Sequence, residues 1–546
     1  MKLRHPVLCL SVLAALSATS GAALAKPVKD QVYKITILHT NDHHGRFWRN
    51  GDGEYGMAAR KNVIEQIRAD VRKNGGYSLL LDGGDVNTGV PESDMQDAEP
   101  DFKGMNLLGY DAMAVGNHEF DKSPEVLAKQ RQWINFPMLS ANIYKDGKRM
   151  FEPYRIFKLG DVRVAVMGLT TDDTKKLTNP ENTKGIAFRK PAREAAKLVP
   201  QLRKQADVVI ATTHMGHYDN GDHGVNAPGD VEMARAVKGL NLIVGGHSQN
   251  PVCMKAENVR DTAYVPGADC APDRQNGAWI VQAHEWGKYV GRADFELKNG
   301  EFKLVKYQLI PVNLKKTVKD SAGKEQKVYY TQQIAEHSEV LAFLRPYQNK
   351  GQEALSVEIG ATEAKLDGDR NQVRSQPASM GILIASAMKE KAQADFAIMN
   401  SGGVRDSIAA GKITYKDVLK VQPFGNTLVY VDMSGKEALD LLRTAAKMSP
   451  GSGAFPQFAG VKLVIEGGEL KQAQIGGKDI DAAKTYRVAM NNFTAAGGDG
   501  YPKLSSHKGY VNTGYADADV LKAFISARNG VIKAGAFDAA GEIVRK

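Results

Sequence analysis

Short apolar runs recur along residues 33–291, and each is followed by a polar segment rich in Gly, Asp, Asn or His. Runs of this length with many β-branched side chains predict strands, here over 33–39, 78–81, 112–115, 162–167, 207–212 and 242–244. Apolar positions at helical spacing predict helices over 57–73 and 191–205. Strands that alternate with helices in this way predict a layered α/β sheet.

A second α/β unit is predicted beyond a polar, helix-prone connector. Its pattern predicts helices over 375–391 and 437–447 and strands over 396–399 and 427–431. We therefore expect an N-terminal catalytic domain over 26–335, a helical linker or hinge over 336–360, and a smaller C-terminal substrate-binding domain over 361–546. A length of 546 residues is consistent with this division.

The first 25 residues have a different pattern. Lys2 and Arg4 precede an apolar run over 7–16, and Ala23-Leu24-Ala25 ends it with small residues. This pattern is typical of a signal peptide that is cleaved after Ala25. A membrane anchor is the alternative, but the run is too short to span a bilayer comfortably. We therefore expect a periplasmic protein without a membrane anchor.

Composition excludes some partners and predicts one covalent link. The formal charge is +10, but the lysines are scattered, so a nucleic acid polymer is not an expected partner. Removal of the signal peptide leaves Cys253 and Cys270, which in an exported protein predict one disulfide. A zinc knuckle is the alternative, and it lacks a second pair of ligands.

Five strand ends carry side chains of the kinds that bind metal ions. They are Asp42 and His44, Asp85, Asn117, His214, and finally His247 and Gln249. In layered α/β folds the carboxyl ends of strands form the site, so these residues are expected to meet. Each histidine alone is more often structural, but the convergence of five motifs favours a metal site. The Asp85 carboxylate has lone pairs for two cations and can bridge them.

Carboxylate, imidazole and amide ligands suit divalent ions such as zinc, manganese or cobalt. No thiolate takes part, so a structural zinc cage is not expected. Two such ions about 3.5–4 Å apart can share a hydroxide nucleophile and clamp the oxygens of an in-line phosphoryl displacement. The predicted chemistry is phosphoester hydrolysis.

The ordered blocks Asp-x-His, Gly-Asp, Gly-Asn-His-Glu, His and Gly-His-x-Gln resemble those of calcineurin-like metallophosphoesterases. The strings over 38–45 (LHTNDHHG) and 400–405 (NSGGVR) narrow the resemblance to the periplasmic bifunctional UDP-sugar hydrolase/5′-nucleotidase family. The resemblance covers essentially the whole mature chain. Gln249 stands where the wider superfamily usually has histidine, and glutamine is the expected ligand in this bacterial branch.

The resemblance implies a fold and residue roles. The N-terminal domain would be an α/β/β/α sandwich. One metal would take Asp42, His44, Asp85 and Gln249, and the other Asp85, Asn117, His214 and His247. His118 and Asp121 resemble the family's catalytic dyad, in which the histidine stabilises charge on the phosphoryl oxygens or assists the leaving group. A carboxylate at a helix N-terminus is an alternative role for Asp121, and His43 is interpreted as structural.

Substrate choice is expected to reside in the C-terminal domain. Phe424 and Phe493 lie in Gly- and Asn-rich loops, where an aromatic ring is a good stacking surface for a base. The resemblance gives them the role of sandwiching the nucleobase. The resemblance assigns contacts with the anionic group of the substrate to Arg370, Arg374 and Arg405. It assigns contacts with the ribose or base edges to Asn426 and Asp499. Surface salt bridges are the alternative role for the arginines.

The resemblance predicts a monomeric enzyme that hydrolyses nucleoside 5′-monophosphates to nucleoside and phosphate, and UDP-sugars to UMP and sugar 1-phosphate, by in-line attack of a metal-bound hydroxide. The enzymatic alternatives are a 2′,3′-cyclic-nucleotide phosphodiesterase/3′-nucleotidase, another nucleotide pyrophosphatase, or a thiosulfate-processing hydrolase. A non-catalytic periplasmic nucleotide-binding protein belongs to a different class, and it would be expected to have lost ligands. Domain closure or rotation about the 336–355 connector is expected as well.

Overall fold

The computed structural model describes residues 27–178, 182–221, 227–321, 323–528, 531–537 and 543–545. The predicted signal peptide over 1–25 lies outside these ranges. Within them, no helix combines the length and apolarity that crossing a bilayer requires.

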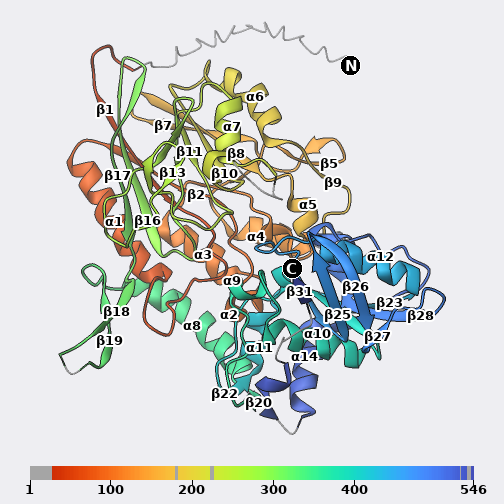
Figure 1. Cartoon of the computed structure of the whole chain (residues 1–546). Coiled ribbons are helices and arrows are strands. Elements are labelled where there is room, and N and C mark those ends of the chain that lie inside the picture. The colour runs from red at the N-terminus through yellow and green to blue at the C-terminus, as the bar shows by residue number, and fades with distance from the viewer. Residues whose placement is uncertain are drawn as a thin grey trace, which may run out of the picture.

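Two six-stranded sheets form the N-terminal half of the molecule (Figure 1). The first has the order β17 (Glu301–Pro311), β16 (Tyr289–Lys298), β1 (Tyr33–Thr40), β2 (Tyr77–Asp82), β3 (Ala112–Ala114) and β4 (Met138–Leu139). The second has the order β14 (Asp273–Gln275), β15 (Ala278–Val281), β11 (Leu242–Val244), β10 (Val208–His214), β8 (Val162–Thr170) and β7 (Tyr154–Leu159). The inner strands β1, β2 and β3 are parallel, as are β8, β10, β11 and β15.

Strand periodicity explains the layers. Ile35 and Ile37 enter the same buried core as Val164 and Val166, so the two sheets pack face to face. Leu38 points the other way, into a core that includes helices α1 (Met57–Lys73) and α3 (Glu99–Leu108). The outer face of the second sheet packs on α6 (Pro191–Leu202) and α7 (Asp230–Ala236). The predicted α/β/β/α sandwich is confirmed.

Helix α8 (Ser338–Leu355) leads into a second α/β unit. Its five-stranded sheet has the order β24 (Pro456–Ala459), β21 (Phe396–Asn400), β28 (Thr485–Asn491), β23 (Thr427–Ser434) and β29 (Tyr510–Ala516). One face shares a core with α10 (Ser379–Lys391), α11 (Tyr415–Val421) and α14 (Asp517–Ser526), and the other with α12 (Gly435–Ala446). The predicted strands and helices of this unit are present.

The predicted helices differ from the observed ones at their ends, and six strands of the two large sheets, β4, β7, β14, β15, β16 and β17, were not predicted. The helix predicted over 191–205 ends at Leu202, and the helix predicted from 375 begins at Ser379. Strands β16 and β17 lie outside the predicted set and extend the first sheet at one edge. They pair antiparallel to each other and to β1, so their place in the sheet depends on long-range pairing.

Smaller elements complete the two units. In the N-terminal half these are α2 (Pro91–Asp94), α4 (Pro124–Trp133), α5 (Thr174–Leu177), β5 (Ile143–Lys145), β6 (Lys148–Arg149), β9 (Ile186–Phe188), β12 (Met254–Ala256), β13 (Val259–Arg260), β18 (Lys315–Lys319) and β19 (Glu325–Tyr329). In the C-terminal half they are α9 (Arg370–Val373), α13 (Asn492–Ala495), β20 (Glu358–Thr362), β22 (Gly411–Thr414), β25 (Val461–Glu466), β26 (Glu469–Ile475), β27 (Lys478–Asp479), β30 (Val531–Ile532) and β31 (Ile543–Arg545).

Candidate active site

The predicted metal ligands lie at the carboxyl ends of strands in both sheets. They follow β1, β2, β3 and β11, and β10 ends at His214 itself. Five of the seven have left-handed backbone: Asp42, His44, Asp85, His247 and Gln249, with φ between 51° and 78°. Such conformations cost on the order of 1–3 kcal/mol each and persist only where the surrounding structure holds them. Backbone bonds between loops do this: Asp42 donates to the Gly84 carbonyl at 2.9 Å and His44 to the Asp85 carbonyl at 3.0 Å.

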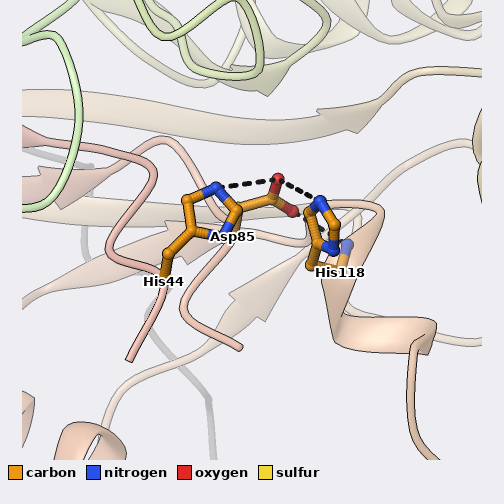
Figure 2. Close-up of side chains that lie close together, drawn as sticks. All are labelled: His44, Asp85 and His118. Carbon is orange, nitrogen blue, oxygen red and sulfur yellow. Dashed lines mark hydrogen bonds and ion pairs between the residues drawn. The ribbon is translucent and has the colours of Figure 1, made fainter. Parts of the chain in front are cut away.

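The Asp85 carboxylate lies at the centre of the cluster. Its Oδ2 is 2.9 Å from His214 Nε2, 3.8 Å from His118 Nε2 and 3.9 Å from His44 Nε2. Figure 2 shows the carboxylate between the rings of His44 and His118. On the far side, His247 Nδ1 lies 3.2 Å from His214 Nε2. Asp85 thus belongs to two groups of atoms that could hold a metal ion, one with His44 and His118 and the other with His214 and His247.

The free lone pairs of this cluster fit divalent cations. His44 Nδ1 and His214 Nδ1 lie 2.9 Å and 2.7 Å from the carbonyls of Thr88 and Gly83, so each Nδ1–H donates to a carbonyl and each Nε2 is the ring nitrogen that faces Asp85. Oδ1 of Asp42 and Oδ1 of Asn117 are buried without a hydrogen-bond partner. Buried acceptors that converge without donors are costly unless a cation binds them.

The charges of the cluster support the same conclusion. Burial opposes ionisation of Asp85, but the neighbouring His214 and His118 outweigh it and hold the pKa of Asp85 below its usual range. Burial lowers the pKa of His214, yet attraction to Asp85 is stronger and raises it to about 10. The site therefore draws positive charge to the bridging carboxylate, which two metal ions would supply.

Asn117, His118 and Asp121 come from the loop after β3. His118 Nδ1 lies 2.5 Å from Asp121 Oδ2. Burial lowers the pKa of His118, but Asp121 and Asp85 outweigh burial and raise it to about 9. Ser123, rather than Asp121, is the N-cap of α4, so the carboxylate of Asp121 is bound to the imidazole instead of the helix end.

Gln249 lies beside the cluster, and its amide nitrogen, not its oxygen, faces the predicted metal ligands. Its Nε2 is 2.7 Å from His44 Nε2, while Oε1 accepts a hydrogen bond from Arg370 Nη1 at 3.2 Å. Coordination through oxygen requires the reversed amide. His43 is fully buried and contacts Arg60, which agrees with the structural interpretation.

Sequence reasoning assigned no role to Glu119, which organises two of the ligand loops. Its carboxylate accepts the backbone N–H groups of Gly116, Val86, Asp85 and Asn87 at 2.7, 2.9, 3.1 and 3.3 Å. This links the loop after β2 to the loop after β3. The only sequence signal was its place in the Gly-Asn-His-Glu block.

A cavity of about 860 Å³ lies between the two α/β units. All seven predicted substrate-binding residues line it: Arg370, Arg374, Arg405, Phe424, Asn426, Phe493 and Asp499. So do six residues of the predicted metal site and dyad, namely Asp85, Asn117, His118, Asp121, His247 and Gln249. Asp42, His44 and His214 are buried and are not among the lining residues. Asn400, from the string 400–405 that the sequence singled out, also lines it, and so do residues that the sequence did not single out, among them Asp173, Leu177, Thr178, Tyr218 and Asn250.

The aromatic rings occupy different parts of this cavity wall. Phe424 stacks on His118, with ring centroids 5.9 Å apart and an interplanar angle of 14°. Phe493 packs so closely on Gly498 that a Cβ there would lie 2.5 Å from the ring. Asn400 donates to Asp499 Oδ2 at 2.7 Å and thereby orients that carboxylate.

Three arginines, Arg370, Arg374 and Arg405, gather positive charge on the C-terminal wall of the cavity. Burial, then repulsion from the neighbouring guanidinium groups, lowers the pKa of Arg374 to about 9 and that of Arg405 to about 10. Like charges gathered on one wall of a cavity are relieved by an anionic ligand.

Cys253 and Cys270 form a disulfide. The predicted pairing is confirmed, and the zinc-knuckle alternative is wrong.

Two family models match the chain. The calcineurin-like phosphoesterase model matches residues 35–251, and the 5′-nucleotidase C-terminal domain model matches residues 358–506. Protein UshA of Escherichia coli (strain K12) is 57% identical over 549 aligned residues, with all of both chains covered. The 5′-nucleotidase of Vibrio cholerae is also 57% identical, over 98% of each chain.

Solved structures agree on the fold. A 5′-nucleotidase precursor from Thermus thermophilus superposes with a TM-score of 0.75 at 28% identity, covering 94% of this chain and 99% of that chain. A sulfate thiohydrolase, SoxB, from Thermus thermophilus has the same fold, with a TM-score of 0.68 at 19% identity over 95% of this chain and 97% of that chain. The chain is a hydrolase that belongs to the UshA-like 5′-nucleotidase/UDP-sugar hydrolase family of calcineurin-like phosphoesterases.

Proposed function

We propose that this enzyme hydrolyses nucleoside 5′-monophosphates to nucleoside and phosphate, and UDP-sugars to UMP and sugar 1-phosphate. We place it in the periplasm as a monomer with two divalent cations. One observation carries the proposal: the cluster around Asp85 and the arginine–aromatic wall of the other domain line one cavity. A bound nucleotide can therefore place its phosphoryl group at the Asp85 cluster while its base contacts the aromatic rings of the other domain.

The donor set divides between two cations. Asp42, His44, Asp85 and a reversed Gln249 amide would hold one, and Asp85, Asn117, His214 and His247 the other. When bound, such a pair supplies an activated water and polarises the phosphoryl oxygens. The side-chain Nδ1–H groups of His44 and His214 donate to backbone carbonyls, and these bonds fix the ring nitrogen that each histidine presents.

His118 contributes to the chemical step through its Nε2, which lies on the cavity side of the dyad. Asp121 Oδ2 lies 2.5 Å from Nδ1 and favours the protonated imidazole, with or without cations on Asp85. A protonated ring can donate to a phosphoryl oxygen as negative charge develops, or to the departing oxygen. The contact with Asp121 fixes the orientation of the ring.

The C-terminal domain supplies specificity in this proposal. Arg370, Arg374 and Arg405 neutralise phosphate oxygens, and Phe493 with Phe424 provides stacking surfaces for the base. The Asp499 carboxylate, oriented by Asn400, accepts from ribose or base donors. Chemistry and recognition therefore come from different domains.

The test is a substrate panel measured with metal analysis of the purified protein: AMP, UDP-glucose, NAD, 2′,3′-cyclic nucleotides and an aryl phosphate.

Phe493→Ala is the sharper variant, because Phe424 also packs on His118. Loss of one stacking surface worth about 1–3 kcal/mol should lower kcat/KM for AMP roughly 5- to 150-fold. The rate with the aryl phosphate, which has no base, should stay within about twofold. Equal losses on both substrates would refute the base clamp. Faster hydrolysis of cyclic nucleotides than of AMP would refute the proposed substrate class.

A further inference from the structure

Two of the ligand-bearing segments are joined by a side chain outside the cavity. One segment runs from His214 to His217 after β10, and the other from His247 to Pro251 after β11. Arg260, on β13, donates from Nη2 to the His217 carbonyl at 3.3 Å and from Nη1 to the Pro251 carbonyl at 3.4 Å. One planar guanidinium thus binds the backbone of both segments.

The same arginine fixes a buried histidine. Arg260 Nη2 lies 3.0 Å from His217 Nδ1, and His217 Nε2 lies 2.9 Å from Asp273 Oδ2. Because arginine can only donate, Nδ1 accepts, and Nε2–H donates to the carboxylate. The side chains of His217 and Asp273 are both fully buried.

Ser248 completes the link between the segments. Its Oγ accepts the backbone N–H of His217 at 3.1 Å and donates to Gln282 Oε1 at 3.0 Å. Ser248 lies between His247 and Gln249 in the chain. Movement of the His217 segment would therefore displace the ligand pair on either side of Ser248.

The position of Arg260 depends on a closed loop. The Cys253–Cys270 disulfide encloses β12 and β13, and Met254 pairs with Arg260 between these strands. Outside the loop, Arg260 pairs with Asp219 at 2.9 Å, and 17% of its side chain is exposed. The disulfide therefore limits how far the guanidinium can move from the two segments.

We infer that Arg260 is a positioning residue for metal binding: from the disulfide-closed loop it holds together the segments that carry His214, His247 and Gln249. The inference rests on the metal site of the proposed function. It concerns metal affinity rather than substrate choice. Residues that orient ligands in this indirect way typically change metal affinity 10- to 100-fold when replaced.

The test compares Arg260→Gln with Lys255→Gln, a control on the same hairpin whose exposed side chain forms an ion pair with Asp261. Metal-free protein is titrated with Zn²⁺ against a chromophoric chelator, and release of Zn²⁺ to EDTA is timed. Arg260→Gln should bind at least one Zn²⁺ about tenfold or more weakly and release it faster. Lys255→Gln should match the wild type. Cys253→Ser combined with Cys270→Ser should change affinity in the same direction as Arg260→Gln.

Unchanged Zn²⁺ affinity in a folded Arg260→Gln protein would overturn the inference, even if its thermal stability falls. If that variant does not fold, Arg260→Lys keeps the charge beside Asp219 but cannot reach both carbonyls, and it should show the same weakening. A wild-type protein that binds no Zn²⁺ would contradict both proposals. Tight Zn²⁺ binding without hydrolysis of any nucleotide would contradict the proposed function alone.

Discussion

Single side chains around the candidate site are oriented by fixed partners. His118 is held by Asp121 on one side and faces Asp85 on the other. The Glu119 carboxylate accepts hydrogen bonds from backbone N–H groups of the loops that carry Asp85 and Asn117, and these bonds fix the spacing between the two loops. The chemistry of each side chain depends on which of its ring or carboxylate atoms is not already hydrogen-bonded and can contact substrate.

His118→Ala should lower kcat by about 10²- to 10⁴-fold, since it removes the donor to the phosphoryl or leaving oxygen. Metal content should stay at the wild-type level, because His118 is not among the proposed ligands. Steady-state kinetics and elemental analysis of the same preparations test this. Full activity, or loss of metal together with activity, would contradict the assignment of the dyad.

His39 makes a second residue-scale prediction, on stability against pH. Burial lowers the pKa of His39 to about 3, against 6.5 for the free side chain. Below pH 6.5 the unfolded chain therefore binds a proton that the folded protein does not, and the free energy of unfolding falls as pH falls towards 3. The loss is about 1.4 kcal/mol per pH unit for this group.

His39→Phe removes that titration while keeping a ring beside Tyr307. Urea unfolding of both proteins at pH 6.5 and pH 5 should show that the wild type loses about 2 kcal/mol more than the variant over this interval. The difference between the two pH values cancels any constant packing cost of the phenyl ring. Equal losses would show that His39 does not titrate in this way.

At the scale of elements, close packing between helices determines whether alanine can replace glycine in α8. Helix α8 contacts α2, and a Cβ added to Gly351 would lie 2.7 Å from Glu92 Cβ and 2.8 Å from its Cα. Helix propensity favours alanine over glycine by about 1 kcal/mol. Overpacking of this kind costs about 1–3 kcal/mol.

Gly351→Ala should therefore lower the free energy of unfolding by about 1 kcal/mol, despite the better helix former. Lys350→Ala, at an exposed neighbouring position on α8, is the control and should be neutral or slightly stabilising. Urea unfolding measures both. A Gly351→Ala protein more stable than the wild type would show that α2 moves aside without cost.

For the whole molecule, side-chain contacts link the two α/β units. Contacts that cross between them include Phe424 on His118, Arg370 to Gln249, and an ion pair between Lys416 of α11 and Glu92 of α2. The Glu92 side chain is only 2% exposed. Separation of the domains would hydrate this carboxylate, so Lys416 stabilises the arrangement described here.

Lys416→Ala should shift the population toward more open domain arrangements, seen as a larger radius of gyration in solution scattering. Lys420→Ala is the matched control, because Lys420 lies on the same helix and pairs with Asp417 of its own domain. A radius of gyration unchanged by Lys416→Ala would mean that the ion pair does not govern the arrangement.

Local sequence by itself determined the layered α/β character, the strand ends that carry the ligands, and the spacing of His118 and Asp121. These features depend on residues near one another in the chain, whose periodicity fixes which face is buried and where a strand ends. The family resemblance added the roles of the arginines and aromatic rings.

Only the tertiary structure decided which distant groups meet. Glu119 gathers N–H groups from two loops, Arg260 joins two ligand segments from a third, and Gln249 divides its amide between His44 and Arg370. No periodicity records such contacts, because each depends on packing of the whole chain that brings separate loops within hydrogen-bonding distance. The sequence therefore predicted which side chains could bind metal ions, while the orientation and support of those side chains were properties of the folded molecule.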